Sequence, residues 1–129
     1  MARGRERHDA RLAAVAGLGR ELNRRARSKC ELCGEGGSLK VVEVPTAPDE
    51  PDVDAALMSC ARCRPIVEEG HSRDAPDTLR FLAEMVWAEV APVQIVAVRA
   101  ARALAEQGVD WAQDAVDGLW LDEAIEARL

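Results

Sequence analysis

The sequence predicts a small α+β protein in which a cysteine-containing segment is followed by a bundle of three to four helices. Two CxxC pairs, at residues 30–33 and 60–63, are spaced so that a hairpin between them would bring the pairs together. Residues 39–44 between the pairs are rich in valine, which favours a β-strand. From residue 74 onward, apolar residues recur at helical spacing. The chain of 129 residues is long enough for one modest core.

Residues 1–27 are expected to form a basic N-terminal helix or arm. Apolar residues recur near every 3.6 positions over residues 5–27, which predicts a helix. Gly17 and Gly19 interrupt this pattern, and each costs up to about 1 kcal/mol relative to alanine inside a helix. The helix is therefore expected to be marginal or bent. The apolar stripe consists of Leu12, Val15, Ala16, Leu22 and Ala26.

Basic and acidic residues are unevenly distributed along the chain. Residues 1–29 contain nine Lys and Arg against three Asp and Glu, whereas the remaining residues contain eight against twenty. Such asymmetry is typical of a basic arm that contacts nucleic acid or an acidic partner. The alternative is a solvated helix that pairs with the chain's own acidic body. The net charge of −6 slightly favours this alternative, because the overall field repels polyanions at long range.

Residues 28–72 contain all four cysteines, Cys30, Cys33, Cys60 and Cys63, and are expected to form one module. Gly34 directly follows the first pair, where a tight turn often needs a positive φ. Proline and aspartate are frequent in the middle of the segment, which is typical of a loop. The expected elements are a strand over 39–44 closed by Pro45, a loop over 45–54, a short strand or turn over 55–59, and a helical turn over 65–69 ended by Gly70.

The four cysteines predict one structural Zn²⁺ site, because two CxxC turns supply the closed tetrahedral thiolate shell that zinc prefers. The charged N-terminus lacks the apolar core of a secretory signal, so a cytoplasmic location with reduced thiols is expected. Disulfides need an oxidising compartment, iron–sulfur clusters usually have tighter cysteine spacings, and a redox CxxC usually occurs singly. Zinc binding of about 10–16 kcal/mol would then serve as folding energy. Whether the module is a zinc ribbon or treble-clef-like depends on whether a helix begins at the second CxxC.

Residues 73–129 are expected to form the helical bundle. Asp74 or Asp77 is predicted to cap a first helix, which ends before Pro92. Pro92 itself suits the first turn of a second helix. The inward face expected for the first helix consists of Leu79, Leu82, Val86 and Val90.

The second helix of the bundle is expected to stop at Gly108. Asp110 and Gln113 are spaced like a capping box that opens a third helix, and Asp122 is predicted to cap a short last one. These helices are also the candidate surface for a homodimer. The tryptophans expected to pack in the core or between helices are Trp87, Trp111 and Trp120.

Several local motifs occur together in one known family. They are residues 27–34 (RSKCELCG), 42–45 (VEVP), 60–63 (CARC), 81–82 (FL), 85–90 (MVWAEV), 93–94 (VQ), 111–114 (WAQD) and 121–123 (LDE). Over roughly residues 20–125 the chain resembles the PhnA-type zinc-ribbon family, named from alkylphosphonate-utilisation operons. The resemblance implies that the four family cysteine ligands fall on the four cysteines here. Family members often continue into a small SH3-like β-barrel, whereas this sequence ends at Leu129.

The sequence favours a non-enzymatic zinc-binding module that contacts nucleic acid or a protein partner. Basic residues beside the cysteines are Arg24, Arg25, Arg27, Lys29, Arg62 and Arg64. They either contact phosphates or simply solvate the surface, and the sequence leaves both open. Glu31, inside the first CxxC, is expected to face solvent. No apolar stretch approaches the roughly 20 residues needed to cross a bilayer, so no membrane partner is expected.

Two hydrolase functions are the alternatives. The order of CxxC, hairpin, CxxC and helix also resembles the zinc-bearing frame of HNH nucleases, which carry histidines on the hairpin strand. Residues 40–45 (KVVEVP) contain none, and the only histidines are His8 and His71, so a degenerate relative fits better than an active nuclease. A phosphonate hydrolase, implied by the family name, would need an open metal position or an activated nucleophile. No such constellation stands out in the sequence.

Overall fold

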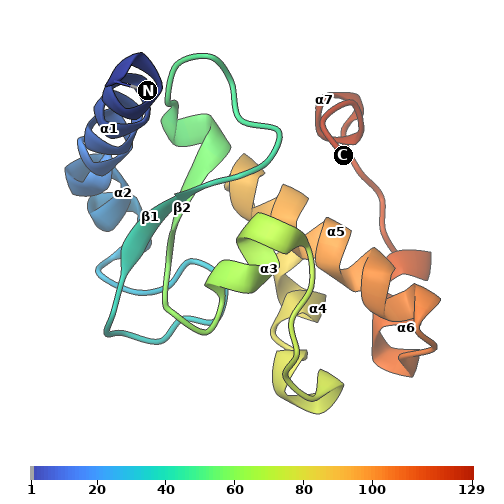
Figure 1. Ribbon diagram of the computed structural model, residues 1–129. Coiled ribbons are helices and arrows are strands. Elements are labelled where there is room, and N and C mark those ends of the chain that lie inside the picture. The colour runs from blue at the N-terminus through green and yellow to red at the C-terminus, as the bar shows by residue number, and fades with distance from the viewer. Residues whose placement is uncertain (1) are drawn as a thin grey trace.

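The computed structural model describes residues 2–129 and shows a small α+β protein in which helices predominate (Figure 1). Its two strands, β1 (Lys40–Glu43) and β2 (Ala56–Ser59), pair antiparallel as a hairpin. Val42 of β1 lies opposite Leu57 of β2. Because successive side chains of a strand point to opposite faces, the hairpin presents two faces to its surroundings. Every residue of β2 is buried, so both faces are covered.

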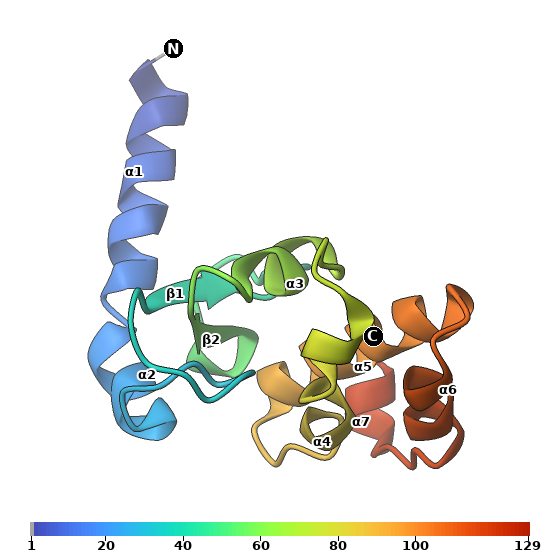
Figure 2. The same ribbon diagram turned by 90° about the horizontal axis from the view of Figure 1, so that it is seen from below.

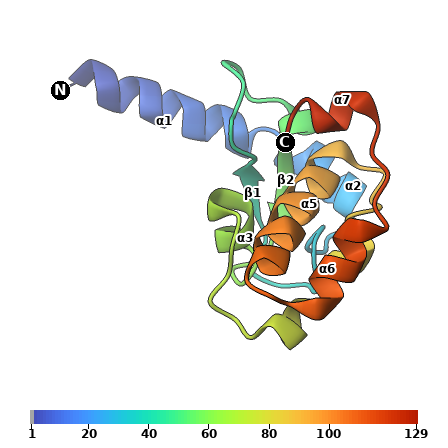
Figure 3. The same cartoon turned by 90° about the vertical axis from the view of Figure 1, so that its right-hand side faces the viewer.

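Two helices, α1 (Ala2–Ala16) and α2 (Gly19–Ala26), precede the hairpin. The helix predicted over residues 5–27 is therefore interrupted at Gly17 and Leu18, and the bend expected from the glycines is confirmed. The chain changes direction here, because α1 projects away from the rest of the molecule whereas α2 lies beside the hairpin (Figures 2 and 3).

One face of the hairpin, the face opposite the main core, is covered by α2. Leu22 is completely buried and packs with Ala56 and Met58 of β2. By contrast, the side chains of α1 are mostly exposed, and its buried residue, Val15, lies near the end that meets the hairpin. The apolar stripe predicted from the sequence therefore contacts the body only in part, since Leu12 is 52% exposed.

Two short helices flank β2 in the sequence. The 3₁₀ helix η1 (Val53–Ala55) leads into the strand, and α3 (Arg64–Glu69) begins directly after Cys63. Gly70 follows α3 with a φ of +79°, and its N–H donates to the carbonyl oxygen of Ile66 at 3.0 Å. The helical turn predicted over residues 65–69 and its glycine stop are confirmed.

The C-terminal half is built around α5 (Ala91–Glu106), which has nine buried residues. A helix that is apolar on most sides is buried on most sides. Pro92 lies in its first turn and Gly108 follows its end with a φ of +86°, as the sequence predicted. One continuous apolar core connects α5 to Val42 and Leu57 of the hairpin and to the cysteines. The shorter helices of this half are α4 (Leu82–Met85), α6 (Asp110–Asp117) and α7 (Glu123–Glu126).

The single helix predicted from Asp74 or Asp77 to Val90 is wrong. The segment forms a 3₁₀ helix, η2 (Pro76–Leu79), and then the one-turn α4. Pro76 forces the preceding Ala75 into an extended conformation, so the capping position falls on an alanine that has no side-chain acceptor. The buried positions were nevertheless predicted correctly at Leu79, Leu82 and Val86, whereas Val90 is only partly buried.

The capping box predicted at Asp110 and Gln113 is also wrong. Val109 occupies the cap position of α6, and Gln113 donates to Asp117 at 2.7 Å instead. Gly108 turns the chain so that Val109 is extended, which places Asp110 inside the first helical turn. Asp122 does precede α7, but its side chain makes no capping hydrogen bond.

The packing predicted for the tryptophans holds for one of the three. Trp111, on α6, packs against the core. Trp87 and Trp120 are 52% and 76% exposed, and they follow α4 and α6 rather than lying on a helix. Among the helices of residues 2–129, none is long and apolar enough to cross a membrane.

Candidate metal centre

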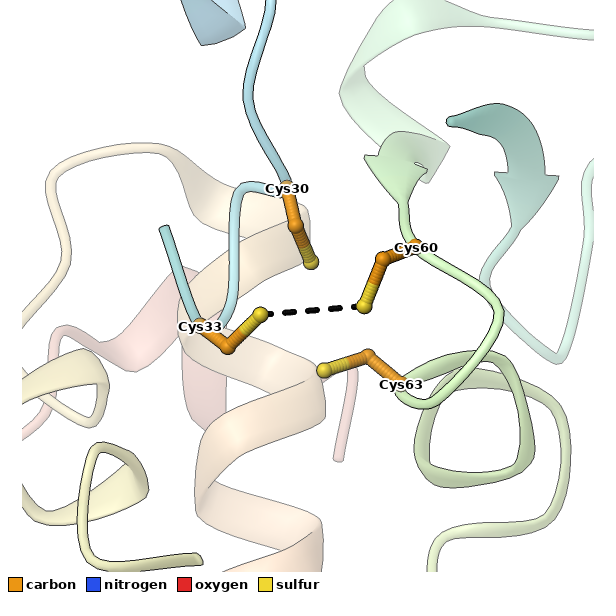
Figure 4. Close-up of side chains that lie close together, drawn as sticks. All are labelled: Cys30, Cys33, Cys60 and Cys63. Atoms are coloured by element: carbon orange, nitrogen blue, oxygen red, sulfur yellow. Dashed lines mark hydrogen bonds between the residues drawn. The ribbon is translucent and has the colours of Figure 1, made fainter. Parts of the chain in front are cut away.

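The four cysteine sulfurs converge on one point, as the sequence predicted (Figure 4). The Sγ atoms of Cys30, Cys33, Cys60 and Cys63 all lie within 4.8 Å of one another. The Cys33 and Cys60 sulfurs are 3.7 Å apart, much farther than the roughly 2.05 Å of a disulfide bond, and all four thiols are free. Cys30, Cys60 and Cys63 are buried. The group can hold one metal ion.

The first CxxC turn is closed by its own backbone. The Gly34 N–H donates to the carbonyl oxygen of Cys30 at 2.9 Å, and the Cys30 N–H donates to that of Glu35 at 2.8 Å. Gly34 has a φ of +80°, a conformation that costs glycine little and most other residues more. The glycine predicted to permit this turn therefore does so, and both sulfurs of the pair face the same point.

The second CxxC turn connects β2 to α3. The Arg64 N–H donates to the carbonyl oxygen of Cys60 at 3.2 Å, and the Val67 N–H to that of Cys63 at 3.2 Å. Cys63 occupies the position just before α3, so the start of this helix fixes its backbone. The hairpin returns the chain from the first turn to the second, which explains how cysteines far apart in sequence meet.

The environment of the sulfurs favours a thiolate at Cys30 and protonated thiols at Cys33 and Cys63. The Cys63 thiol donates to Cys30, and the backbone N–H groups of Cys33, Cys60 and Leu32 also donate to it, which lowers the pKa of Cys30 to about 4. The hydrogen bond to Cys30 and burial raise the pKa of Cys63. Burial raises the pKa of Cys33 to about 11. A metal ion bound here must displace protons from Cys33 and Cys63.

Glu31, inside the first CxxC, was expected to face solvent, and this is wrong. Its side chain is only 5% exposed. Its carboxylate accepts the Met58 backbone N–H at 2.9 Å, while the Glu31 N–H donates to the carbonyl oxygen of Met58 at 2.9 Å. Glu31 thus hydrogen-bonds to β2 on the edge that does not face β1. The sequence could not predict this burial, because a glutamate in a turn is usually exposed and its partner, Met58, is far away in the chain.

Arg25 of α2 completes this part-buried network. Its guanidinium donates to both carboxylate oxygens of Glu31, at 2.8 and 2.9 Å. It also donates to the carbonyl oxygens of Val53 and Ala56, each at 2.8 Å. One side chain therefore joins α2, the first CxxC turn and the start of β2. The basic arm and the cysteine group are mechanically connected through this pair.

The six basic residues predicted near the cysteines have different surroundings. Arg24, Arg27 and Lys29 are exposed. Arg25 is engaged by Glu31 and by backbone carbonyl oxygens. Arg62 donates to the carbonyl oxygen of Thr78 at 2.9 Å and lies 5.3 Å from the centre of the Phe81 ring. Arg64 donates to the carbonyl oxygen of Ser38 at 2.7 Å. Three of the six basic residues, Arg25, Arg62 and Arg64, are therefore engaged in contacts within the protein.

Comparisons of the chain with models of known families, with curated proteins and with solved structures find no match. The fold and the site by themselves define a class: a small α+β protein with a largely buried group of four free cysteines that can hold a metal ion. They also show that a basic helical arm is attached to this group through a part-buried ion pair between Arg25 and Glu31.

Proposed function

We propose that the protein is a non-enzymatic zinc-binding module of the PhnA type, in which the metal is structural. The convergence of four free thiols supports this most strongly. In a tetrahedron with zinc–sulfur bonds of about 2.3 Å, the sulfurs are about 3.8 Å apart. The 3.7 Å between the Cys33 and Cys60 sulfurs agrees with that distance. Four thiolates leave no open position for water or substrate, which favours a structural over a catalytic metal.

The choice of zinc rests on ligand chemistry. A tetrahedral set of four thiolates suits zinc or iron among the common metals. Zinc has no redox chemistry and is the usual ion of CxxC turns that surround a hairpin. A treble-clef-like module is favoured over a ribbon, because α3 begins directly after Cys63.

The metal module is proposed to hold the arm in place for binding nucleic acid. Arg11 and Arg25 pair with Glu43 and Glu31 of the body. The other basic residues of the arm, and Lys29 just after it, are exposed: Arg3, Arg5, Arg7, Arg20, Arg24, Arg27 and Lys29. Since α1 projects away from the acidic body, its outer arginines are accessible to a phosphate backbone (Figure 2).

Fluorescence anisotropy with labelled duplex DNA and single-stranded RNA tests the arm. The variant is Arg3→Gln/Arg5→Gln/Arg7→Gln, and the matched control is Arg73→Gln/Arg80→Gln/Arg102→Gln, which removes the same charge from exposed sites elsewhere. Each lost phosphate contact should reduce the slope of log affinity against log salt by about 0.9 on duplex DNA. We expect a smaller slope for the arm variant only. Absence of binding at low salt would argue against nucleic acid and favour an acidic protein as the partner of the arm.

The metal itself is tested by elemental analysis of the purified protein. We expect one zinc per chain, retained in Ala61→Ser and lost in Cys60→Ser. Neither hydrolase function gains support from the geometry. The Nε2 atom of His71 lies 3.9 Å from a carboxylate oxygen of Glu69, with both side chains more than half exposed, as in an ordinary surface pair. Magnesium-dependent nicking abolished by His71→Ala, or phosphate release from phosphonoacetate, would favour a hydrolase instead.

A further inference from the structure

A pocket separate from the four cysteines lies between the chain after β1, the helix α5 and the last residues of the chain. Its volume is about 370 Å³. Val44, Ile95 and Leu129 form its apolar walls. The polar part of its lining includes Thr46, Arg99 and Arg128. Small-molecule sites usually have volumes of about 300–1,000 Å³, so the pocket is large enough for a small ligand.

The two arginines are held in place by backbone carbonyl groups. Arg99 donates to the carbonyl oxygen of Pro45 and, at 2.8 Å, to that of Arg128. Arg128 in turn donates to the carbonyl oxygen of Asp54 at 2.7 Å. These bonds fix the positions of both guanidinium groups, yet they leave further N–H donors on each, since a guanidinium has five.

Carbonyl oxygens do not neutralise these charges. Within residues 2–129, the ion pairs of the protein involve other residues, and neither Arg99 nor Arg128 has a carboxylate partner. Burial and the nearby charge of Arg128 together lower the pKa of Arg99. A positively charged pocket therefore exists in a chain whose net charge is −6. Two like charges held close together are unfavourable unless an anion lies between them.

We propose that this pocket binds the phosphate group of a small phosphorylated molecule, with the phosphate bridging Arg99 and Arg128. A tetrahedral dianion neutralises both guanidinium groups and accepts several N–H bonds, which a single carboxylate does less completely. The pocket exceeds one oxyanion in size, so the organic part of the ligand lies against Val44 and Ile95. The site shares no residue with the arm, and its two arginines lie outside the cysteine segment, although Val44 and Thr46 of that segment line it.

Isothermal titration calorimetry with glycerol 3-phosphate tests this site in the intact protein. The variant is Arg99→Gln, and the matched control is Arg102→Gln, an exposed arginine one turn further along α5. We expect saturable binding to the natural protein and to Arg102→Gln, and affinity reduced at least about tenfold in Arg99→Gln. Inorganic phosphate should compete, whereas glycerol should not.

Because Arg99 also anchors the end of the chain, Arg128→Gln serves as a second variant, and circular dichroism checks that both remain folded. Arg128→Gln should also weaken binding about tenfold. Equal binding of acetate and glycerol 3-phosphate would overturn the preference for phosphate. Absence of saturable binding to the natural protein, or unchanged binding in both variants, would overturn the site and indicate that the arginines only fasten the chain's end.

Discussion

The cysteine segment is built from short elements, whereas the helical half contains one long buried helix, and the two regions therefore differ in how much their own packing can stabilise them. Residues 30–70 contain two four-residue strands and a six-residue helix. The C-terminal half contains α5, whose 16 residues include nine that are buried. An isolated two-stranded hairpin is marginally stable at best, whereas a buried helix gains from each apolar side chain it removes from water. We therefore expect the first region to need the proposed metal ion in order to fold, and the second region to need its apolar core.

The two regions nevertheless share a boundary. Cys30, Cys60 and Cys63 belong to the same apolar core as the buried face of α5. Burial of the thiols in that core helps to raise the pKa of Cys33 and Cys63. Loss of the metal is therefore expected to weaken the contact between the regions without removing the helices themselves.

The largest expected effect comes from removing one ligand. Cys60→Ser should abolish tight metal binding and with it much of the roughly 10–16 kcal/mol that a structural zinc site contributes. Hydrogen exchange should show loss of protection in β1 and β2 and partial retention in α5. Ala61→Ser, which places the same hydroxyl on an exposed neighbour, is the control and should behave like the natural protein. A protected hairpin in metal-free Cys60→Ser would show that the segment folds without its ligands.

Acidification should release the metal from the first region before the second unfolds. Cys33 and Cys63 have raised pKa values in the metal-free group, so both are protonated at neutral pH and both protons must leave on binding. Protons therefore compete with the metal as pH falls, and loss of these two protons alone should make the apparent affinity drop by at least about a hundredfold per pH unit. Below a pH of about 4 the Cys30 thiolate is protonated as well.

Zinc release followed with a chromophoric chelator, alongside the helical signal in circular dichroism, measures this sequence of events. Affinity independent of pH would mean that the thiols are already deprotonated or are not the ligands.

A core truncation should affect the second region by a smaller amount. Leu82 is completely buried beside α5, and Leu82→Ala should lower the free energy of unfolding by about 2–5 kcal/mol in zinc-saturated protein. Leu12→Ala, at a position that is 52% exposed on α1, is the matched control and should change it by less than about 0.5 kcal/mol. Denaturant unfolding measures both. Similar losses in the two variants would show that the helical half does not depend on its core.

The smallest effect concerns the connection between arm and metal module. Glu31→Gln retains the shape of the side chain but leaves the largely buried Arg25 without its counter-charge, which should cost about 2 kcal/mol. Glu35→Gln, at an exposed position just beyond the same turn, should cost less than about 0.5 kcal/mol. Faster hydrogen exchange in α2 for Glu31→Gln alone would confirm the connection. Equal behaviour of the two variants would mean that Leu22 by itself fixes α2.

The sequence was informative wherever local chemistry decided the structure. The CxxC pairs, Gly34 and Gly70 at positive φ, and Pro92 at the start of α5 all act within a few residues of themselves. Their positions could therefore be read from spacing alone, and the convergence of the four cysteines followed.

The errors occurred where distant contacts decided the structure. Glu31 is buried because Met58 of β2, 27 residues further along the chain, supplies its backbone partner, and Arg25 of α2 supplies its counter-charge. The turn that contains Thr78 and Phe81 is held by Arg62, a contact that no helical pattern reveals. The pocket at Arg99 also escaped prediction, since its residues come from three separate parts of the chain.

X-ray absorption at the zinc edge of the purified protein identifies the atoms bound to the metal and measures their distances. We expect one zinc ion per chain with four sulfur neighbours at about 2.3 Å. Nitrogen or oxygen atoms in the coordination shell, or protein that contains no zinc while its cysteines are oxidised to disulfides, would contradict this expectation.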